Sequence, residues 1–308
     1  MLPRVALGLA FFLGSMALGW WLRRRGLLPE ARAARLIRFL VTTTSPIVLC
    51  LSFWRIPLHS REPWLLPLIG LLVSASCLVP AALYARRALT RPQAGSFLTC
   101  AFFSNLGYFG AFTGFALYGE AGYALCVLYL MFFTPCFYTL GFWIAASYGR
   151  GYAPAGGKAA FSDRLRFIPF LGMLAGAALN LAGVARPPAL ERLNSVLIPF
   201  DTAVYLMAAG SQVRLASPRP WLRSCVVMSG IKFLYAPAVA WLLAELAGLH
   251  GAARAIVLLE ASTPVAVSPL VLPLLFGLNR SLANALWLFT TVAAVGWFLV
   301  LIPLLPRL

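Results

Sequence analysis

The chain has 308 residues, of which 61% are hydrophobic and only 11% are charged. Its mean hydropathy of +0.87 is higher than a soluble domain of this size requires, which excludes the soluble classes of protein. A net charge of +17 would suggest nucleic-acid binding in a soluble protein, but the basic residues here lie mostly in short loops between apolar runs, so we expect no nucleic-acid partner.

Apolar runs of about 20 residues follow one another along the chain, and each is long enough to cross a bilayer as a helix. The first ends at Arg23, Arg24 and Arg25 and is too long for the apolar core of a signal peptide, so we expect it to remain. The longest polar connection, Gly149 to Arg164, has the composition of a flexible linker. We therefore predict an all-α polytopic membrane protein with ten transmembrane helices, at residues 3–22, 36–54, 64–85, 95–118, 121–148, 165–184, 190–211, 221–248, 253–276 and 281–304.

The distribution of basic residues predicts the orientation of these helices. Loops that follow odd-numbered helices, together with the first turn of the helix after each loop, carry 17 of the 25 Arg and Lys residues. Short loops rich in Arg and Lys stay on the cytoplasmic side of a membrane. We therefore expect the odd-numbered loops in the cytoplasm, both termini outside, and the protein in the cell (inner or plasma) membrane as a multi-pass protein.

The cysteines and histidines give no sign of a metal site. None of the six cysteines belongs to a CxxC pair, and the two histidines, His59 and His250, lie in loops. We interpret the cysteines as small core residues and expect neither a metal nor a disulfide. They are Cys50, Cys77, Cys100, Cys126, Cys136 and Cys225.

Landmarks of the first half recur in the second half after a nearly constant offset of 157 or 158 residues. This offset spans five helices, an odd number, so the second copy enters the membrane from the opposite side, as in the inverted repeats of secondary transporters. We predict a first five-helix repeat at residues 1–155 and a second, inverted repeat at 156–308. The coinciding pairs include Gly19 with Gly176, Gly26 with Gly183, Pro80 with Pro237, and Gly119 with Gly277.

Two stretches within helices four and nine are unsuited to a regular helix in lipid: "FFSNLGYFGAFTG" at Phe102–Gly114 and "EASTPVAVSP" at Glu260–Pro269. Irregular backbone persists at membrane depth only where it is buried in protein or lines a wet cavity. The repeat offset places Asn105 to Gly107 on Ser262 to Pro264, so we predict two broken helices that face one another around a transport site. The alternative is a glycine-rich face that allows close helix packing.

Broken helices expose N–H groups at one end and C=O groups at the other, which attract anions and cations respectively. Lys232 lies within helix eight and is expected either to pair with a substrate carboxylate or to extend to the cytoplasmic interface. Glu260 is expected either to carry a proton or cation or to form an ion pair with Lys232. Asp201, after Pro199, is either a proton carrier or part of a capped, hydrated helix turn. The other candidate substrate-binding residues are Asn105, Gly107, Gly110, Thr263, Pro264 and Ser268.

Several motifs, taken in order, resemble the auxin efflux carrier family of permeases, which includes bacterial malonate-type carriers and plant auxin exporters. The first helix closes with "LGWWLRRRGLL", and helix four carries "SNLGYFG" followed by "ALYGEAGYA". Helix five contains "FYTLG", helix eight contains "IKFLYAP", and helix nine contains "LLEASTPVAVSPLVLPLLFGL". The resemblance runs nearly from end to end of the chain.

The resemblance implies ten helices in two inverted five-helix repeats, a fold related to bile-acid sodium symporters and sodium/proton antiporters, with helices four and nine broken and crossing. It also implies a moving domain of helices three to five and eight to ten, a scaffold of helices one, two, six and seven, and a homodimer joined through the scaffold. Substrates in the family are small organic anions, so Asn105, Gly107, Thr263 and Pro264 inherit a binding role.

Two positions depart from the family pattern. Many relatives have a proline where this chain has Phe112, so the break in helix four must rely on Gly107, Gly110 and Gly114. Phe112 would then form a wall of a tighter, more hydrophobic substrate site, or helix four would be intact. Relatives usually have apolar residues near Asp201, which therefore marks either a proton-coupling site or a hydrated scaffold face.

Together these features predict a permease that moves a small carboxylate across the membrane by elevator-like alternating access, with no cofactor. A carrier coupled to sodium or protons is the first alternative, and a membrane receptor that does not transport is the second. We expect no enzyme, because an intramembrane aspartyl protease needs two membrane aspartates and only Asp201 qualifies, while a serine protease needs a histidine near Ser211.

Overall fold

The computed structural model describes residues 2–56, 58–149, 168–212 and 218–304, and within these ranges every named element is a helix. Most of the predicted linker at Gly149–Arg164, and with it the predicted repeat boundary at 155/156, lies outside the described residues. The chain is an all-α membrane protein, as its composition predicts. Six of the described helical segments are long and apolar enough to cross a membrane: Glu30–Phe53, Glu62–Ala88, Leu106–Tyr148, Pro188–Ser211, Arg219–Leu246 and Arg280–Pro303.

The residue contacts divide the chain into two compact units, each assembled from separate stretches of sequence. The first unit comprises Met1–Trp64, Gly107–Leu128 and Asp163–Val213. The second unit comprises Leu65–Leu106, Tyr129–Ser162 and Arg214–Leu308.

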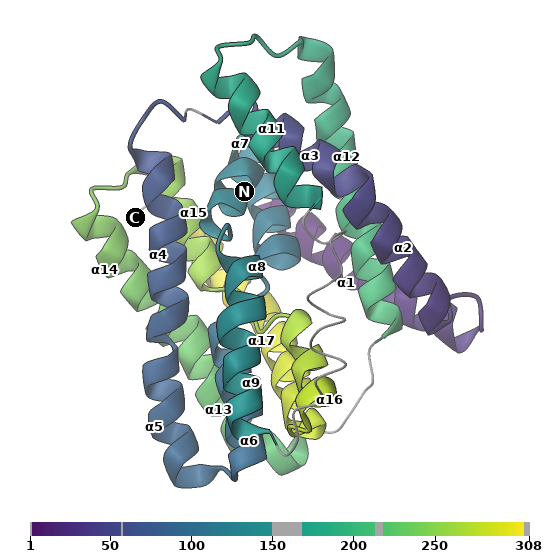
Figure 1. Cartoon of the computed structure of the whole chain (residues 1–308), viewed down its shortest axis with the longest axis vertical. Helices are drawn as coiled ribbons and strands as arrows, with labels where there is room; N and C mark the ends of the chain where they lie inside the picture. The colour runs from purple at the N-terminus through teal and green to yellow at the C-terminus, as the bar shows by residue number, and fades with distance from the viewer. Residues whose placement is uncertain (1, 57, 150–167, 213–217, 305–308) are drawn as a thin grey trace. The chain divides into compact units, whose positions relative to one another are not determined.

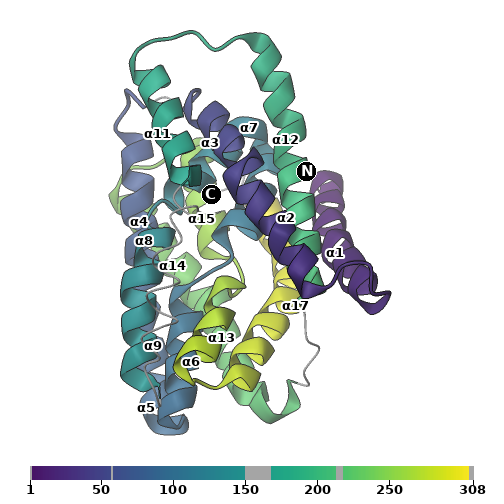
Figure 2. The ribbon, with the colours of Figure 1, turned by 45° about the vertical axis from the view of Figure 1, so that its right-hand side comes forward.

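In the first unit, α12 lies alongside α1 and α2 in both views (Figures 1 and 2). Helix α11 packs on α3 in the same unit. The helices of this unit are α1 (Leu2–Arg24), α2 (Glu30–Thr42), α3 (Thr44–Phe53), the π-helix η1 (Leu106–Gly110), α7 (Ala111–Tyr129), α11 (Ile168–Leu181) and α12 (Pro188–Ser211).

Glycines allow these two helix pairs to approach closely. A Cβ at Gly19 of α1 would collide with the main-chain carbonyl of Met207 in α12, and a Cβ at Gly176 of α11 would collide with that of Cys50 in α3. Gly19 and Gly176 are 157 residues apart, and so are Cys50 and Met207. The α1–α12 contact therefore recurs as the α11–α3 contact at the offset found in the sequence.

The turns that end α1 and α11 also recur at this offset. Gly26 has φ +72° and Gly183 has φ +69°, a left-handed conformation that glycine adopts without steric cost. The Gly26 N–H donates to the carbonyl of Arg23 at 2.9 Å, and the Gly183 N–H donates to the carbonyl of Asn180 at 3.0 Å. The same two upstream residues cap neighbouring helices: Arg23 donates to the Ser211 carbonyl at 2.8 Å and Asn180 to the Trp54 carbonyl at 2.7 Å.

The second unit holds the remaining helices. Thr90 and Gln93 form a capping box at the start of α6, and the proline at its second position suits a helix N-terminus. The helices are α4 (Glu62–Ser76), α5 (Leu78–Ala88), α6 (Arg91–Phe102), α8 (Phe133–Cys136), η2 (Phe137–Gly141), α9 (Phe142–Tyr148), η4 (Arg219–Trp221), α13 (Leu222–Gly230), η5 (Ile231–Tyr235), α14 (Ala236–Leu246), α15 (Gly251–Ala261), η6 (Ser268–Val271), α16 (Leu272–Phe276) and α17 (Arg280–Leu304).

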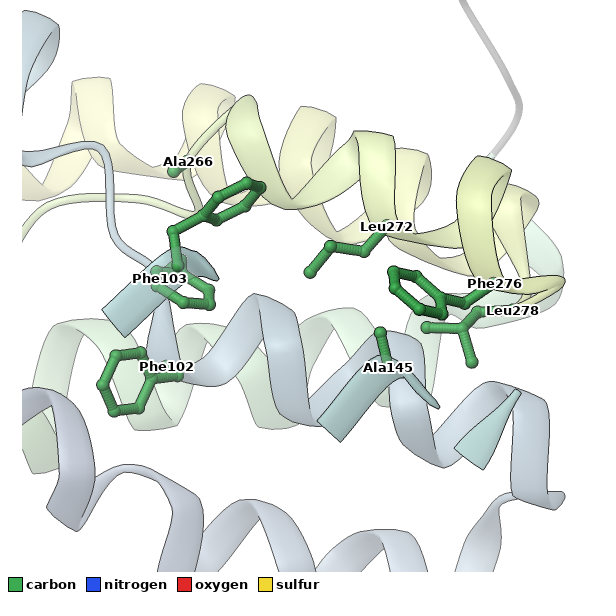
Figure 3. Close-up of a cluster of buried hydrophobic side chains, with 8 residues drawn as sticks. Phe102, Phe103, Ala145, Ala266, Leu272, Phe276 and Leu278 are labelled. Atoms are coloured by element: carbon green, nitrogen blue, oxygen red, sulfur yellow. The ribbon is translucent and has the colours of Figure 1, made fainter. Parts of the chain in front are cut away.

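A cluster of buried apolar side chains stabilises the second unit around the points where α6 and α15 end (Figure 3). Phe103 and Ala266 lie close together in this cluster, and each follows the end of a helix. Within a membrane such packing stabilises the unit through van der Waals contacts between closely fitted side chains. The labelled members are Phe102, Phe103, Ala145, Ala266, Leu272, Phe276 and Leu278.

The helix at residues 95–118 is interrupted, but not where the glycines suggest. Helix α6 ends at Phe102, and Phe103 has extended backbone with φ −94° and ψ 113°. Residues 106–110 are already wound as the π-helix η1, so the prediction that the break relies on Gly107 and Gly110 is wrong. An intact helix, the other alternative, is also wrong. Glycine lowers the free-energy cost of a non-helical backbone but does not impose one. The break forms instead where backbone N–H and C=O groups have hydrogen-bond partners outside the helix.

Candidate functional site

The two interrupted helices of the second unit meet in a short antiparallel pairing of extended backbone. Ser104, after α6, forms an isolated β-bridge with Val265, after α15. The Asn105 N–H donates to the carbonyl of Pro264 at 2.7 Å, and the Ala266 N–H donates to the carbonyl of Phe103 at 3.1 Å. We call residues 103–105 and 264–266 the crossing. These bonds satisfy backbone groups that a broken helix would otherwise leave unpaired.

A threonine of α17 supports the crossing from the side. The Val265 N–H donates to the hydroxyl oxygen of Thr290 at 3.2 Å. The Thr290 hydroxyl in turn donates to the Leu286 carbonyl of its own helix at 2.8 Å. Thr290 is fully buried, so these bonds fix the crossing in an environment without competing water.

Two helix C-termini end at the crossing, and each presents carbonyl oxygens with partial negative charge. The last turn of α15 is closed by its own chain, because the Thr263 hydroxyl donates to the Glu260 carbonyl at 2.8 Å. Thr263 directly precedes the crossing, and its hydroxyl proton is used to cap α15. Ser268 begins η6 five residues later and is half-buried.

Lys232 provides a positive charge at the end of α6. Its ammonium nitrogen donates to the carbonyl of Ala101 at 2.6 Å and to the hydroxyl of Ser104 at 2.7 Å. The side chain is fully buried, so it does not extend to the membrane interface. Lys232 lies in the π-helix η5, which interrupts the segment between α13 and α14. Single π-turns within α-helices occur frequently at functional sites.

Two further candidate residues are buried in the second unit. Glu260, in the last turn of α15, is fully buried. Asn105 is 7% exposed, and its carboxamide makes no hydrogen bond to the described residues. Because an amide carries two donors and an acceptor with two lone pairs, Asn105 retains polar capacity for a ligand at the crossing.

Four predicted site residues belong to the first unit instead. Gly107 and Gly110 lie in η1, and the ring of Phe112 in α7 stacks on Phe11 of α1 with 4.7 Å between centroids. Asp201 in α12 accepts hydrogen bonds from Thr44 at 2.5 Å and from Ser45 at 2.9 Å, at the junction of α2 and α3.

Ser104, which belongs to the crossing, and Thr290, which supports it, were not predicted from the sequence. Ser104 stands next to Asn105 in the polar stretch and could have been included on that ground. Thr290 is one of two adjacent threonines in a largely apolar helix, and its role depends on a partner 25 residues away. Nothing in the spacing of the sequence indicates that contact.

A buried ion pair in the first unit was also not predicted from the sequence. Glu120 follows Gly119, whose φ of +64° kinks α7, and Arg186 precedes α12. Arg186 donates through both terminal nitrogens to the two carboxylate oxygens of Glu120. Asn194 donates to the same carboxylate. The hydrogen bond with Glu120 raises the pKa of Arg186 above its ordinary value, so this guanidinium stays charged.

No family model matches the chain. An uncharacterized transporter of Methanocaldococcus jannaschii is 26% identical over 221 residues, which cover 67% of this chain and 68% of that protein. An uncharacterized transporter of Methanothermobacter thermautotrophicus is 24% identical over 283 residues, which cover 90% of this chain and 91% of that protein.

Proposed function

We propose that this protein is a secondary transporter that moves a small organic anion, a carboxylate, across the cell membrane by alternating access. The observation that carries the proposal is the crossing, where two helices stop within one apolar unit and their backbones join through Asn105 and Ala266. Such discontinuous helices form ion and substrate sites in transporters, because helix ends place partial charges inside the membrane.

The relatives and the basic chemistry of the crossing support a carrier of anions. Both relatives are named transporters, and one aligns with 90% of this chain. Two of the three N–H donors of Lys232 bond to described residues, and the group keeps one donor for an anion. The buried Asn105 carboxamide adds two more donors.

Alternating access requires two parts that move against each other, and we propose that ten helices in two inverted repeats form them. The contacts of Gly19 and Gly176, and the caps of Arg23 and Asn180, recur at an offset of 157 residues and support this layout. Thr44 and Asp201 are also 157 residues apart and hydrogen-bond to each other, as expected for two mates beside a pseudo-two-fold axis.

In this proposal, helices one, two, six and seven form a scaffold through which the protein dimerises. Helices three to five and eight to ten carry the substrate, and both termini lie outside the cell. Asp201 then belongs to the scaffold, where Thr44 and Ser45 hold its carboxylate across the junction of two helix segments. We assign Asp201 a structural role and place substrate binding at Asn105, with Lys232 nearby.

Counterflow in proteoliposomes tests the proposed function. Vesicles loaded with unlabelled malonate, malate or indole-acetate are diluted into a trace of the labelled compound, with arginine and glucose as cationic and neutral comparisons. We expect saturable accumulation of at least one carboxylate and none of arginine or glucose. Accumulation of arginine or glucose would contradict the anion assignment, and no accumulation of any carboxylate would contradict carboxylate transport.

A further inference from the structure

Lys232 occupies the place where a broken helix would attract a cation. The last carbonyl groups of α6 have no partners further along their own helix, and the end of the helix carries partial negative charge. The ammonium nitrogen of Lys232 lies 2.6 Å from the Ala101 carbonyl oxygen in this last turn. A positive charge supplied by the protein itself therefore neutralises the end of α6.

The two groups that bind this ammonium are also typical ligands of an alkali cation. One is a main-chain carbonyl oxygen and the other is the hydroxyl oxygen of Ser104, at 2.7 Å. Carbonyl oxygens of unwound backbone and helix C-terminal ends bind sodium in coupled transporters, as hard oxygen ligands bind hard cations. Here the oxygens of Ala101 and Ser104 are already engaged by nitrogen.

Because Lys232 is buried, its ammonium group stays bound to the oxygens of Ala101 and Ser104. The side chain is fully buried and is held at its other end by η5, so the ammonium cannot leave for solvent without disrupting the unit. A sodium ion at the same oxygens would meet the repulsion of a charge that cannot move away. The end of α6 is consequently a poor place for an exchangeable cation.

We propose that Lys232 is a tethered cation that replaces sodium at the crossing, so that transport needs no sodium ion there. The inference rests on the proposed function for its consequence in transport, but not for its binding chemistry. It favours a uniporter, exchanger or proton-linked carrier over a sodium symporter.

Thermal unfolding tests the binding chemistry without requiring a substrate. The purified protein is melted in sodium chloride and in choline chloride at equal ionic strength. We expect the same melting temperature in both salts for the wild type. In Lys232→Ala, which empties the space beside the two oxygens, sodium should raise the melting temperature over choline by about 3 °C or more.

Two matched variants isolate the effect. Lys232→Arg keeps the charge and should remain insensitive to sodium, while Lys158→Ala removes the chain's other lysine and should also remain insensitive. If Lys232→Ala does not fold, Lys232→Ser is used in its place. A specific stabilisation of the wild type by sodium, or a folded Lys232→Ala or Lys232→Ser protein without a sodium response, would overturn the proposal.

Flux measurements test the consequence for transport. Carboxylate counterflow by the wild type should be equal when sodium is replaced by choline on both sides of the vesicle, and a severalfold stimulation by sodium would refute a tethered cation. If no compound is transported at all, the proposed function fails while the melting experiment still decides whether Lys232 occupies a cation site.

Discussion

At the scale of single residues, a feature outside the crossing that is costly in free energy is the buried ion pair of Glu120 with Arg186. Both side chains are almost fully buried, at 6% and 8% exposure. A buried charge is tolerated only when it is paired and hydrogen-bonded, and here Asn194 donates to Glu120 while Arg186 donates to the Leu51 carbonyl. Two charged groups lie further away: Arg55 is 3.8 Å from Glu120, and Glu191 is 3.9 Å from Arg186. The pair ties the kink at Gly119 to the segment that leads into α12.

Glu120→Gln should destabilise the protein strongly. The substitution leaves the Arg186 guanidinium buried with its best partner neutralised, and loss of one member of a buried pair typically lowers the free energy of unfolding by about 3–5 kcal/mol. Glu245→Gln is the control, because Glu245 pairs with Arg254 at 2.8 Å but is 52% exposed. The control should change stability by about 1 kcal/mol or less in a denaturant titration. Equal effects of the two substitutions would show that the pair is not critical.

At the scale of helices, the sequence predicts both interruptions to within a few residues, because polar residues, glycine and proline are conspicuous in apolar runs. It does not predict the exact position of the first break. Glycines at 107 and 110 lower the cost of unwinding, yet they are wound, and the chain opens at Phe103–Asn105. The deciding partners are the Pro264 carbonyl, which accepts from Asn105, and the Ala266 N–H, which donates to Phe103, and both are distant in sequence.

The backbone bonds of the crossing can be tested directly at Ala266. Ala266→Pro removes the N–H that donates to the Phe103 carbonyl, which leaves a buried acceptor unpaired. We expect the free energy of unfolding to fall by about 1–3 kcal/mol and transport to be lost. Ala266→Gly keeps the donor and should cost about 1 kcal/mol or less. If both variants melt alike, the crossing does not depend on this bond.

The close helix contacts of the first unit make a second prediction at this scale. Gly19→Ala and Gly176→Ala each place a methyl group against a main-chain carbonyl, so each should lower the free energy of unfolding by about 1–3 kcal/mol. Gly14→Ala lies in the same helix as Gly19 with no atom near the added methyl, and it should be neutral or stabilising. A Gly19→Ala protein as stable as Gly14→Ala would argue against close packing of α1 on α12.

At the scale of the whole molecule, the offset of 157 residues is visible in the sequence and recurs in the contacts of Gly19 and Gly176. Glycines such as Gly26 and Gly183 are required by the backbone, so they persist where packing residues vary. Contacts between residues that this offset relates, such as Thr44 and Asp201, cannot be predicted from the sequence pattern. Thr44 donates a hydrogen bond to Asp201 in α12, a partner that the sequence does not indicate.

An inverted repeat predicts that two matching turns lie on opposite sides of the membrane. Leu27 and Val184 are 157 residues apart, both are exposed, and they occupy the same position in their turns. Leu27→Cys should react with a membrane-impermeant maleimide only after the cells are opened, while Val184→Cys should react in intact cells. The unsubstituted chain gives the background of the native cysteines. Labelling of both turns from the same side would exclude inversion.

The most direct test of the central claim is carboxylate counterflow by Asn105→Ala, with the melting temperature measured on the same preparation. The substitution removes a carboxamide that has no hydrogen bond to the described residues but keeps the backbone bond to Pro264, so the protein should melt as the wild type does. Loss of a hydrogen bond to a charged ligand should reduce transport about tenfold or more. Thr139→Ala, which removes an exposed hydroxyl that donates to the Pro135 carbonyl four residues earlier, should transport normally. Undiminished transport by Asn105→Ala would contradict the placement of the anion at the crossing.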